Sequence, residues 1–122
     1  MLPPRPAVHS AIVPIQQAYQ ADLVQEVAAA IAAEKVVVVG VGWLAPGRKA
    51  RQLLEAENIP YKYLQYGNYI VGWRRRLALK MWVGWSTFPL IFINGTFVGG
   101  ASNLRKLIQA GQLKPMLEAP RA

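Results

Sequence analysis

Few residues in this 122-residue sequence could act as nucleophiles, proton carriers or metal ligands. The sequence contains no cysteine, one histidine (His9) and one aspartate (Asp22). A Ser-His-Asp triad or a histidine-containing metal site would therefore require His9, close to the N-terminus, to fold over the rest of the chain. Thiol-disulfide exchange needs a thiolate as its attacking group, so these residues cannot perform it with a side chain of their own.

Two further patterns in the sequence are of types that can bind ligands. Gly40-Val41-Gly42 follows a hydrophobic run, but it lacks the third glycine of a dinucleotide fingerprint, and the helix predicted after it starts with a proline. Trp73, Trp82 and Trp85 could stack on a base or a substrate, although tryptophans on a helical stripe more often belong to a core or its rim. Neither pattern predicts a nucleotide site.

The chain is strongly basic, with 14 lysines and arginines against 6 acidic residues and a formal net charge of +8. A basic surface attracts anions in general. No zinc-ligand spacing, RNA-recognition signature or basic-region heptad accompanies the charge, and the cations are spread along the sequence, so we do not expect a nucleic acid partner. A solvated basic face and a specific anion site both remain open.

The composition is typical of one folded domain, since 53% of the residues are hydrophobic and 16% are charged. No apolar run approaches the roughly 20 residues that span a bilayer, so we expect no membrane partner. The proline-rich start, Met1 to Pro6, gives no support for a secretory signal. The expected location is therefore the cytoplasm.

The first half of the chain predicts an arm followed by alternating helices and strands. Residues 1–14 hold four of the nine prolines and are predicted to be an extended arm, with the domain at 15–122. Apolar positions at three- and four-residue steps predict one helix over about 15–33. The valines at 36–39 predict a strand buried on both faces, and a helix with Pro46 in its first turn is expected to stop before Asn58 and Pro60.

A second strand is expected at 61–64, and after a turn at 66–68 an amphipathic helix that ends near Gly84. Its spacing predicts one apolar inward stripe, with basic residues outward or lateral. The inward set is Ile70, Trp73, Leu77, Ala78 and Met81, and the outward set is Arg74, Arg75, Arg76 and Lys80.

The clearest local pattern is a β-hairpin over 90–99. Two short apolar runs are joined by Asn94-Gly95, residues that tolerate the positive φ of a type I′ turn. Ser102 and Asn103 can cap a following helix, which Gly111 can end, with a last short turn near Leu113. The order of elements predicts an α/β three-layer sandwich around a four-stranded mixed sheet.

Four motifs occur in order after a strand-turn-helix entry at Trp43. They are Trp85-Ser86-Thr87-Phe88-Pro89, Phe92-Ile93-Asn94-Gly95, Phe97-Val98-Gly99-Gly100 and Ala110-Gly111-Gln112-Leu113. With these motifs the sequence from about Lys35 to Leu117 resembles a glutaredoxin, within the thioredoxin fold, and it is most similar to the monothiol branch. The resemblance implies a thioredoxin-like sandwich and glutathione as a ligand.

The resemblance also implies a ligand groove, with Pro89 in the cis form and the Phe88 backbone pairing with an extended peptide. Gly99 and Gly100 would let a ligand backbone approach. The N–H groups near Ser102 and Asn103, at the start of the following helix, could bind the γ-Glu carboxylate, or these residues could be an ordinary helix cap. Arg76 and Lys80 could clamp the glycine carboxylate or could be part of a solvated basic face. The full implied set is Thr87, Phe88, Pro89, Gly99, Gly100, Ser102, Asn103, Arg76 and Lys80.

The sequence departs from the family at the positions where glutaredoxins react. Leu44 stands at the nucleophile position, Gly47 at the second position and Val41 in place of a lysine, while Ser102 and Asn103 replace the acidic residues that often follow the glycine pair. The resemblance therefore implies no catalytic residue. We expect no metal ion and no iron-sulfur cluster, since such a cluster would lack its protein thiolate ligand.

Three functions are compatible with this sequence. The leading hypothesis is a cysteine-free glutaredoxin-like module that binds glutathione, an extended peptide or a protein partner. One alternative is a redox role in which the thiol of bound glutathione supplies the sulfur. The other is a structural role in protein assembly through an exposed sheet edge and the basic helix.

Overall fold

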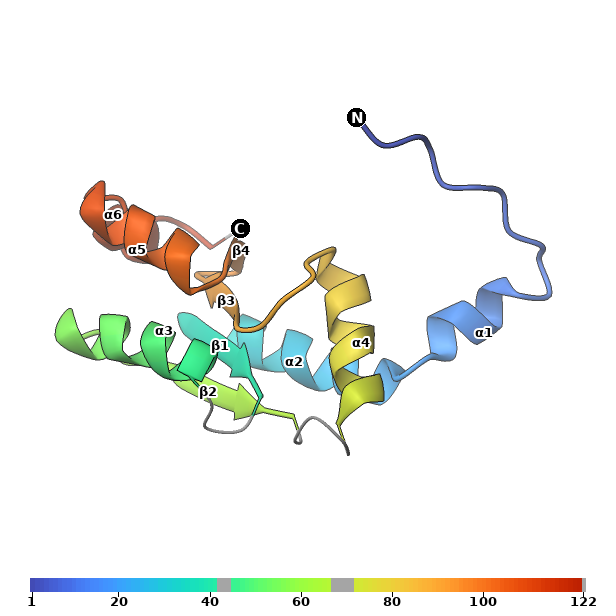
Figure 1. Cartoon of the computed structure of the whole chain (residues 1–122), viewed down its shortest axis with the longest axis horizontal. Helices are drawn as coiled ribbons and strands as arrows, with labels where there is room; N and C mark the ends of the chain where they lie inside the picture. Colours follow the sequence, from blue (N-terminus) through green and yellow to red (C-terminus); the bar gives the residue numbers. More distant parts are fainter. Residues whose placement is uncertain (42–44, 67–71, 122) are drawn as a thin grey trace.

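The computed structural model describes residues 1–41, 45–66 and 72–121. The fold is α/β, with the helices arranged around a central sheet (Figure 1). In chain order the elements are α1 (Val13–Ala18), α2 (Ala21–Ala33), β1 (Val36–Gly40), α3 (Ala45–Ala56), β2 (Lys62–Gln65), α4 (Trp73–Val83), β3 (Leu90–Ile93), β4 (Thr96–Gly99), α5 (Ala101–Gln109) and α6 (Leu113–Glu118). Within these residues no helix is both long and apolar enough to cross a membrane.

The sheet has four strands in the order β2-β1-β3-β4. β1 pairs in parallel with β2 and antiparallel with β3, and β3 pairs antiparallel with β4. The parallel pair results from the crossover through α3, while the tight hairpin forces its two strands to be antiparallel. The predicted four-stranded mixed sheet is therefore confirmed.

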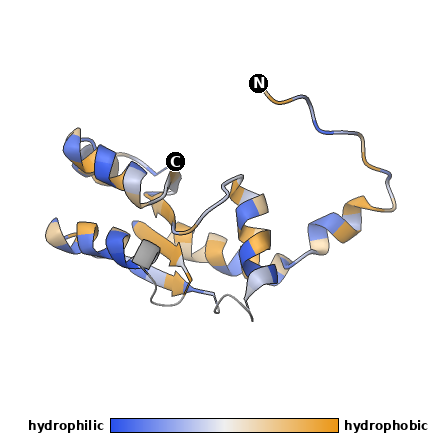
Figure 2. Cartoon of the chain, in the orientation of Figure 1, coloured by the Kyte–Doolittle hydropathy of each residue, from blue (hydrophilic) through white to orange (hydrophobic). Residues whose placement is uncertain are grey.

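The valines of β1 supply both faces of the core because successive side chains of a strand point to opposite sides. Val37 and Val39 pack in the cluster that includes Leu23 and Val27 of α2 and Leu79 of α4. Val36 and Val38 pack in the second cluster, with buried residues of α3, α5 and α6. Figure 2 shows the hydrophobic strands between the helices. The central strand is thus buried on both faces, as its sequence predicts.

The N-terminal helical region differs from its prediction in two ways. The expected helix over 15–33 is broken into α1 and α2, because Gln20 adopts a left-handed conformation with φ 51°. The arm also ends earlier than residue 14, since α1 begins at Val13 and takes Pro14 into its first turn. Figure 1 shows that the arm continues from α1 and lies outside the helices that surround the sheet.

The hairpin turn forms as its residues predict, and it has a further role. Asn94 and Gly95 have positive φ values of 51° and 88°. The Asn94 side chain is buried, and its amide donates hydrogen bonds to the carbonyls of Met116, at 3.1 Å, and Ala119. The turn therefore also anchors α6 and the residues that follow it.

The predicted orientation of the helix after the second strand is wrong. Trp73, Leu77 and Met81, which were expected to face inward, are exposed, with 52%, 39% and 62% of their surface accessible. Arg76, expected outward or lateral, is 7% exposed. Only Ala78 of the predicted inward residues is buried, alongside Leu79, and Ile70 lies outside the described residues. The buried face of α4 therefore contains a charged residue, and an apolar stripe faces outward.

Candidate functional site

A turn after α4 positions the segment that carries the predicted ligand contacts. Gly84 ends the helix in a left-handed conformation with φ 71°, a region that glycine enters without steric cost. The N–H groups of Gly84 and Trp85 both donate to the Lys80 carbonyl, at 2.8 and 3.1 Å. The chain then reaches Phe88 and the buried Pro89, whose peptide bond is cis, as the resemblance implies. Phe88 consequently stands two residues before Leu90, the first residue of β3.

The two predicted cations of α4 lie in different surroundings. The Lys80 ammonium is 5.8 Å from the centroid of the Phe88 ring, within the range of a cation-π contact. The Arg76 guanidinium is buried, and its Nη1 donates to the Tyr66 carbonyl at 3.3 Å. Lys80 thus joins the Phe88 segment, whereas Arg76 holds the chain after β2 to α4.

The glycine pair at the end of β4 lies beside this segment. A Cβ atom added to Gly100 would be 3.6 Å from the Pro89 carbonyl oxygen, so the two chain segments are in contact distance. Gly99 has φ 99°, and an added Cβ would be 2.7 Å from Cγ and Oδ1 of Asn103. Both the backbone conformation and the available space therefore require glycine at position 99.

Asn103 caps the start of α5. Its Oδ1 accepts a hydrogen bond from the Gly100 N–H at 3.0 Å, while Ser102 and Thr87 are exposed. The first amides of a helix have no intrahelical acceptor and form a site of positive potential. We call Phe88, Pro89, Gly99, Gly100 and Asn103 the Gly99 corner. The side chain of Asn103 thus fulfils the capping role that the sequence left as one of two options.

Trp85 packs beside the Gly99 corner. Its ring meets Phe97 edge to face with centroids 5.5 Å apart, and Phe97 in turn packs on Phe92 at 5.4 Å. The indole Nε1 is buried with no hydrogen-bond partner in the described chain, 3.9 Å from the position of a Cβ on Gly100. Leaving a buried donor unpaired costs about 1 to 3 kcal/mol.

A second group surrounds one of the positions at which the family reacts. Leu44 and Trp43 lie outside the described residues, but Gly47 lies in the first turn of α3. The Tyr63 hydroxyl is 3.0 Å from the position of a Cβ on Gly47 and 2.5 Å from that on Gly40. Arg51 stacks over the Tyr63 ring at 4.4 Å, and its Nε donates to the Gly47 carbonyl at 3.3 Å. We call Gly40, Gly47, Arg51 and Tyr63 the Tyr63 corner.

Sequence reasoning missed Tyr63 and Arg51. The glycine at position 47 was interpreted only as a lost reactive residue, whereas the structure places a tyrosine hydroxyl against it. Burial raises the pKa of Tyr63, and the charge of Arg51 opposes that shift. The phenol is thus favoured in its neutral form. The signal in the sequence was the pair of glycines at 40 and 47. In the structure both glycines border the side chain of Tyr63.

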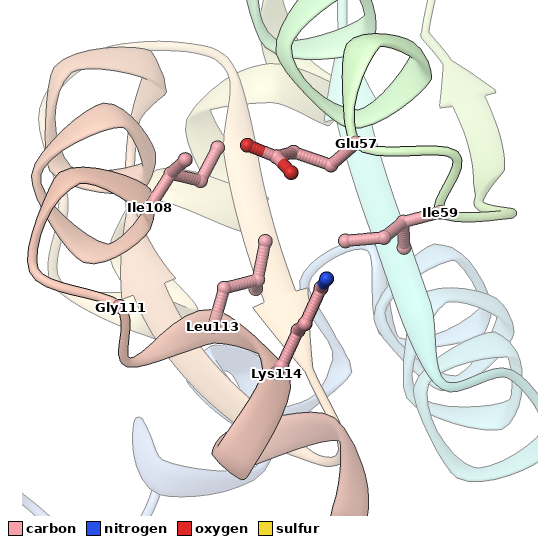
Figure 3. Close-up of a pocket in the computed structure, with 6 residues that line it drawn as sticks. All are labelled: Glu57, Ile59, Ile108, Gly111, Leu113 and Lys114. Atoms are coloured by element: carbon pink, nitrogen blue, oxygen red, sulfur yellow. The ribbon is translucent and has the colours of Figure 1, made fainter.

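A separate pocket of about 230 Å³ lies between the end of α3 and the α5-α6 turn. Figure 3 shows the side chains of Ile108 and Leu113 beside Glu57 and Lys114 at this pocket. None of the predicted ligand-binding residues lines it. The pocket therefore does not belong to either corner.

The described residues contain no group of three or more histidine, cysteine or acidic side chains that could hold a metal ion. An iron-sulfur cluster is held by thiolate sulfur, and the sequence has no cysteine. The side chains of this chain therefore do not fit the protein ligands of such a cluster.

Comparisons with known proteins agree with the geometry. The Glutaredoxin family model matches residues 45–98. A glutaredoxin-like protein of Dictyostelium discoideum is 36% identical over 95 residues, which cover 78% of this chain and 77% of that protein. A probable monothiol glutaredoxin 2 of Rickettsia conorii is 49% identical over 44 residues, which cover 36% of this chain and only 41% of that protein.

Among solved structures, a buckwheat glutaredoxin-glutathione complex superposes with a TM-score of 0.72 over 81% of this chain and 90% of that one. The two share 22% sequence identity, so this likeness shows the fold. Together with the extent of the Dictyostelium match, the order of strands and the Gly99 corner, these findings show that the chain belongs to the glutaredoxin family.

Proposed function

We propose that this chain binds glutathione, or another extended thiol peptide, at the Gly99 corner without exchanging disulfides through side chains of its own. One observation carries the proposal. The Gly99-Gly100 pair lies against the carbonyl of Pro89, while the 122 residues contain no thiol. These two features together support binding without a nucleophile of the chain's own.

The backbone of Phe88 supplies the first set of contacts. An extended peptide can pair with a free N–H and C=O next to a sheet, as an added strand does. Phe88 is half-buried and stands two residues before Leu90, the first residue of β3, so its backbone lies close to the end of the sheet. The absence of a Cβ on Gly100 leaves space for a ligand main chain beside it.

Two positive groups are suited to the ligand's carboxylates. The N-terminus of α5 begins directly after Gly100 and favours an anion. Lys80 lies beside the Phe88 ring and can pair with a second carboxylate. Arg76, part of the predicted clamp, is engaged with the Tyr66 carbonyl, so the proposal assigns the cationic role to Lys80 alone.

The chemistry of such a complex is limited by the missing thiolate. The sulfur of a bound thiol peptide would be the only thiol present, and no side chain of these residues could attack a disulfide. The proposed role is therefore to hold or present the peptide. The same absence sets this proposal apart from an exchange enzyme and makes it testable.

Calorimetric titration with glutathione to about 10 mM tests the binding. We expect a dissociation constant on the order of millimolar, and an approximately 3- to 10-fold weaker one for Lys80→Ala, since one charge-assisted contact contributes about 1 kcal/mol when exposed. Lys62→Ala, an exposed lysine on the edge strand β2, is the matched control and should bind as wild type. Absence of binding by the wild type would refute the proposal.

A disulfide-reduction assay tests the second half of the proposal. The wild type should show no rate above the glutathione-only background. Leu44→Cys introduces a thiol directly before α3 in the sequence, where a helix N-terminus lowers a thiol pKa. This variant should acquire glutathione, as seen by mass spectrometry. Wild-type activity above background would contradict the absence of exchange.

A further inference from the structure

A large pocket lies outside both corners. It has a volume of about 940 Å³ and is bounded by the N-terminal arm, α1, the start of α2 and α4. Figures 1 and 2 show α1 and the arm on the same side of the domain as α4, with hydrophobic residues on both helices. We call this pocket the α1-α4 groove. Its apolar lining includes Val8, Ile15, Tyr19, Leu77, Met81 and Trp82.

These six side chains are exposed, although the Trp82 ring also lies 6.5 Å from the ring of Phe92. Ile15 and Met81 have 66% and 62% of their surface accessible, and the other four are also classed among the exposed large hydrophobic residues. A contiguous apolar surface of this kind on a soluble domain usually marks an interaction site. The three-turn length of α4, about 16 Å, matches the contact length of a short helix.

The charges around the groove select the kind of partner. Arg5 is the only charged residue among those that line it, and the polar residues there are Gln16, Gln17 and Gln25. Arg74 precedes Leu77 by three residues and Met81 by seven, so it extends the same face of α4. On the flanking helix α2, Asp22 is exposed and the Glu26 carboxylate accepts a hydrogen bond from the Tyr66 hydroxyl. Arg5 thus lines the groove itself, while Arg74, whose guanidinium lies 5.2 Å from the centroid of the Trp73 ring, stands beyond the groove lining one turn before Leu77. Of the two nearby acids, Glu26 is hydrogen-bonded.

We propose that the α1-α4 groove binds an amphipathic helix of a partner protein, with its apolar face in the groove and acidic residues toward Arg5 and Arg74. A concave apolar surface between two helices suits this mode of recognition. The chain's own charge of +8 disfavours a second copy, because two such surfaces repel each other. This site is independent of the glutathione role proposed above and shares none of its residues.

The test uses the full chain and a fluorescein-labelled 16-residue peptide that repeats leucine at three- and four-residue steps and has glutamate at the other positions. Its matched partner has lysine in place of every glutamate. Fluorescence anisotropy should show micromolar binding of the acidic peptide and at least 10-fold weaker binding of the basic one. Equal affinity for the two peptides would overturn the proposal. So would the absence of binding of the acidic peptide up to 1 mM, a dissociation constant that corresponds to a binding free energy of about 4 kcal/mol.

Variants locate the binding on the groove. Leu77→Glu combined with Met81→Glu, and Arg74→Glu alone, should each weaken the acidic peptide at least 10-fold, while Lys106→Glu, an exposed residue of α5, should leave it unchanged. All four positions are exposed, and circular dichroism verifies the fold; Met81→Glu alone replaces the double variant if that one unfolds. Glutathione titration of the same variants should match wild type, which separates this site from the Gly99 corner.

The wild type and Met81→Glu also test two other occupants of the groove, a lipid surface and a second copy of the chain. Vesicles of phosphatidylglycerol and phosphatidylcholine that bind wild type but not Met81→Glu, in the absence of peptide binding, would replace the helix by a lipid surface. Concentration-dependent dimerisation in sedimentation velocity that Met81→Glu abolishes would replace it by a second copy. Either result overturns the proposal.

Discussion

The Gly99 corner and the Tyr63 corner lie at successive strand ends of one sheet but differ in what maintains them. The Gly99 corner depends on backbone geometry: a cis peptide bond at Pro89, a positive φ at Gly99 and a helix start capped by Asn103. The Tyr63 corner depends on side-chain volume, because the tyrosine hydroxyl lies against Gly40 and Gly47 and is covered by Arg51.

This difference explains how the Gly99 corner can form in a chain without the thiol residues of the family. Substitution of a thiol residue changes one side chain, whereas a left-handed glycine is fixed by the chain path around it. At position 47 the space is also used by Tyr63, so a serine or cysteine there would meet the hydroxyl. At the Tyr63 corner a side chain limits position 47, whereas at the Gly99 corner the chain path limits position 99.

The largest effect is expected for Gly99→Ala. The new methyl group would lie 2.7 Å from the Asn103 side chain and would force an alanine into φ 99°. Overpacking and backbone strain each cost about 1 to 3 kcal/mol, so we expect a loss of about 3 kcal/mol in the free energy of unfolding. Urea unfolding monitored by tryptophan fluorescence measures it.

Asn103→Ala provides the control for that variant. Alone it removes the cap and should cost about 1 kcal/mol. Combined with Gly99→Ala it removes the two 2.7 Å contacts with Cγ and Oδ1 of Asn103, but it keeps the 3.0 Å contact with Cβ and the backbone strain. The double variant should therefore lose less stability than the sum of the two single losses. Strict additivity would show that Asn103 does not limit position 99.

A smaller effect is expected at the Tyr63 corner for Gly47→Ser. Its Cβ would be 3.0 Å from the Tyr63 hydroxyl, which can move slightly, so the expected loss is about 1 kcal/mol. With Tyr63→Phe the next contact is 3.5 Å, an ordinary van der Waals distance, and serine should then be tolerated. A double-mutant cycle by urea unfolding should give a coupling energy of about 1 kcal/mol. Zero coupling would show that Gly47 is not required by Tyr63.

The smallest effect is expected for the dependence of stability on alkaline pH. It involves Tyr61, which lies just before β2, the strand that carries Tyr63. Burial, with a 2.6 Å hydrogen bond to Glu55, raises the pKa of Tyr61 from 10.0 to about 12. The folded state therefore holds the phenol proton of Tyr61 more tightly than the unfolded state does. The resulting contribution to the free energy of unfolding is complete below pH 10 and is lost as the pH rises from about 10 to about 12.

Tyr61→Phe should reduce the decline of the urea midpoint between pH 9 and 11, with the midpoint at pH 7 as the reference. The pKa of Tyr66 is raised in the same direction by burial and the Glu26 hydrogen bond, so part of the decline should persist. An identical decline in the variant and the wild type would show that Tyr61 does not contribute.

The strands and the hairpin could be predicted because their signals are local. Four consecutive valines require burial on both faces, and Asn94-Gly95 fits a turn with two positive φ values. The break at Gln20 could not be predicted, since glutamine in a left-handed conformation has no local signature. The orientation of α4 was also out of reach, because Arg76 is buried through a carbonyl supplied by Tyr66, ten residues earlier.

The candidate site divides in the same way. The cis Pro89, the Gly99-Gly100 pair and the Asn103 cap follow from motifs, and the structure brings them together. Lys80 is brought to Phe88 only by the turn at Gly84. Arg51 and Tyr63 come from α3 and β2, and neither carries a signal that would assign it to a reactive position.

By itself the sequence determined that this chain has no thiolate, that its order of strands and helices requires a mixed sheet, and that glycine pairs mark tight corners. These properties depend on residue types and short-range backbone preferences. Only the tertiary structure decided that Tyr63 fills the space at Gly47, that Arg76 is buried and that an apolar face of α4 stays outside the core. Each of these results depends on which distant residue lies within a few ångströms, and the linear pattern does not contain that information.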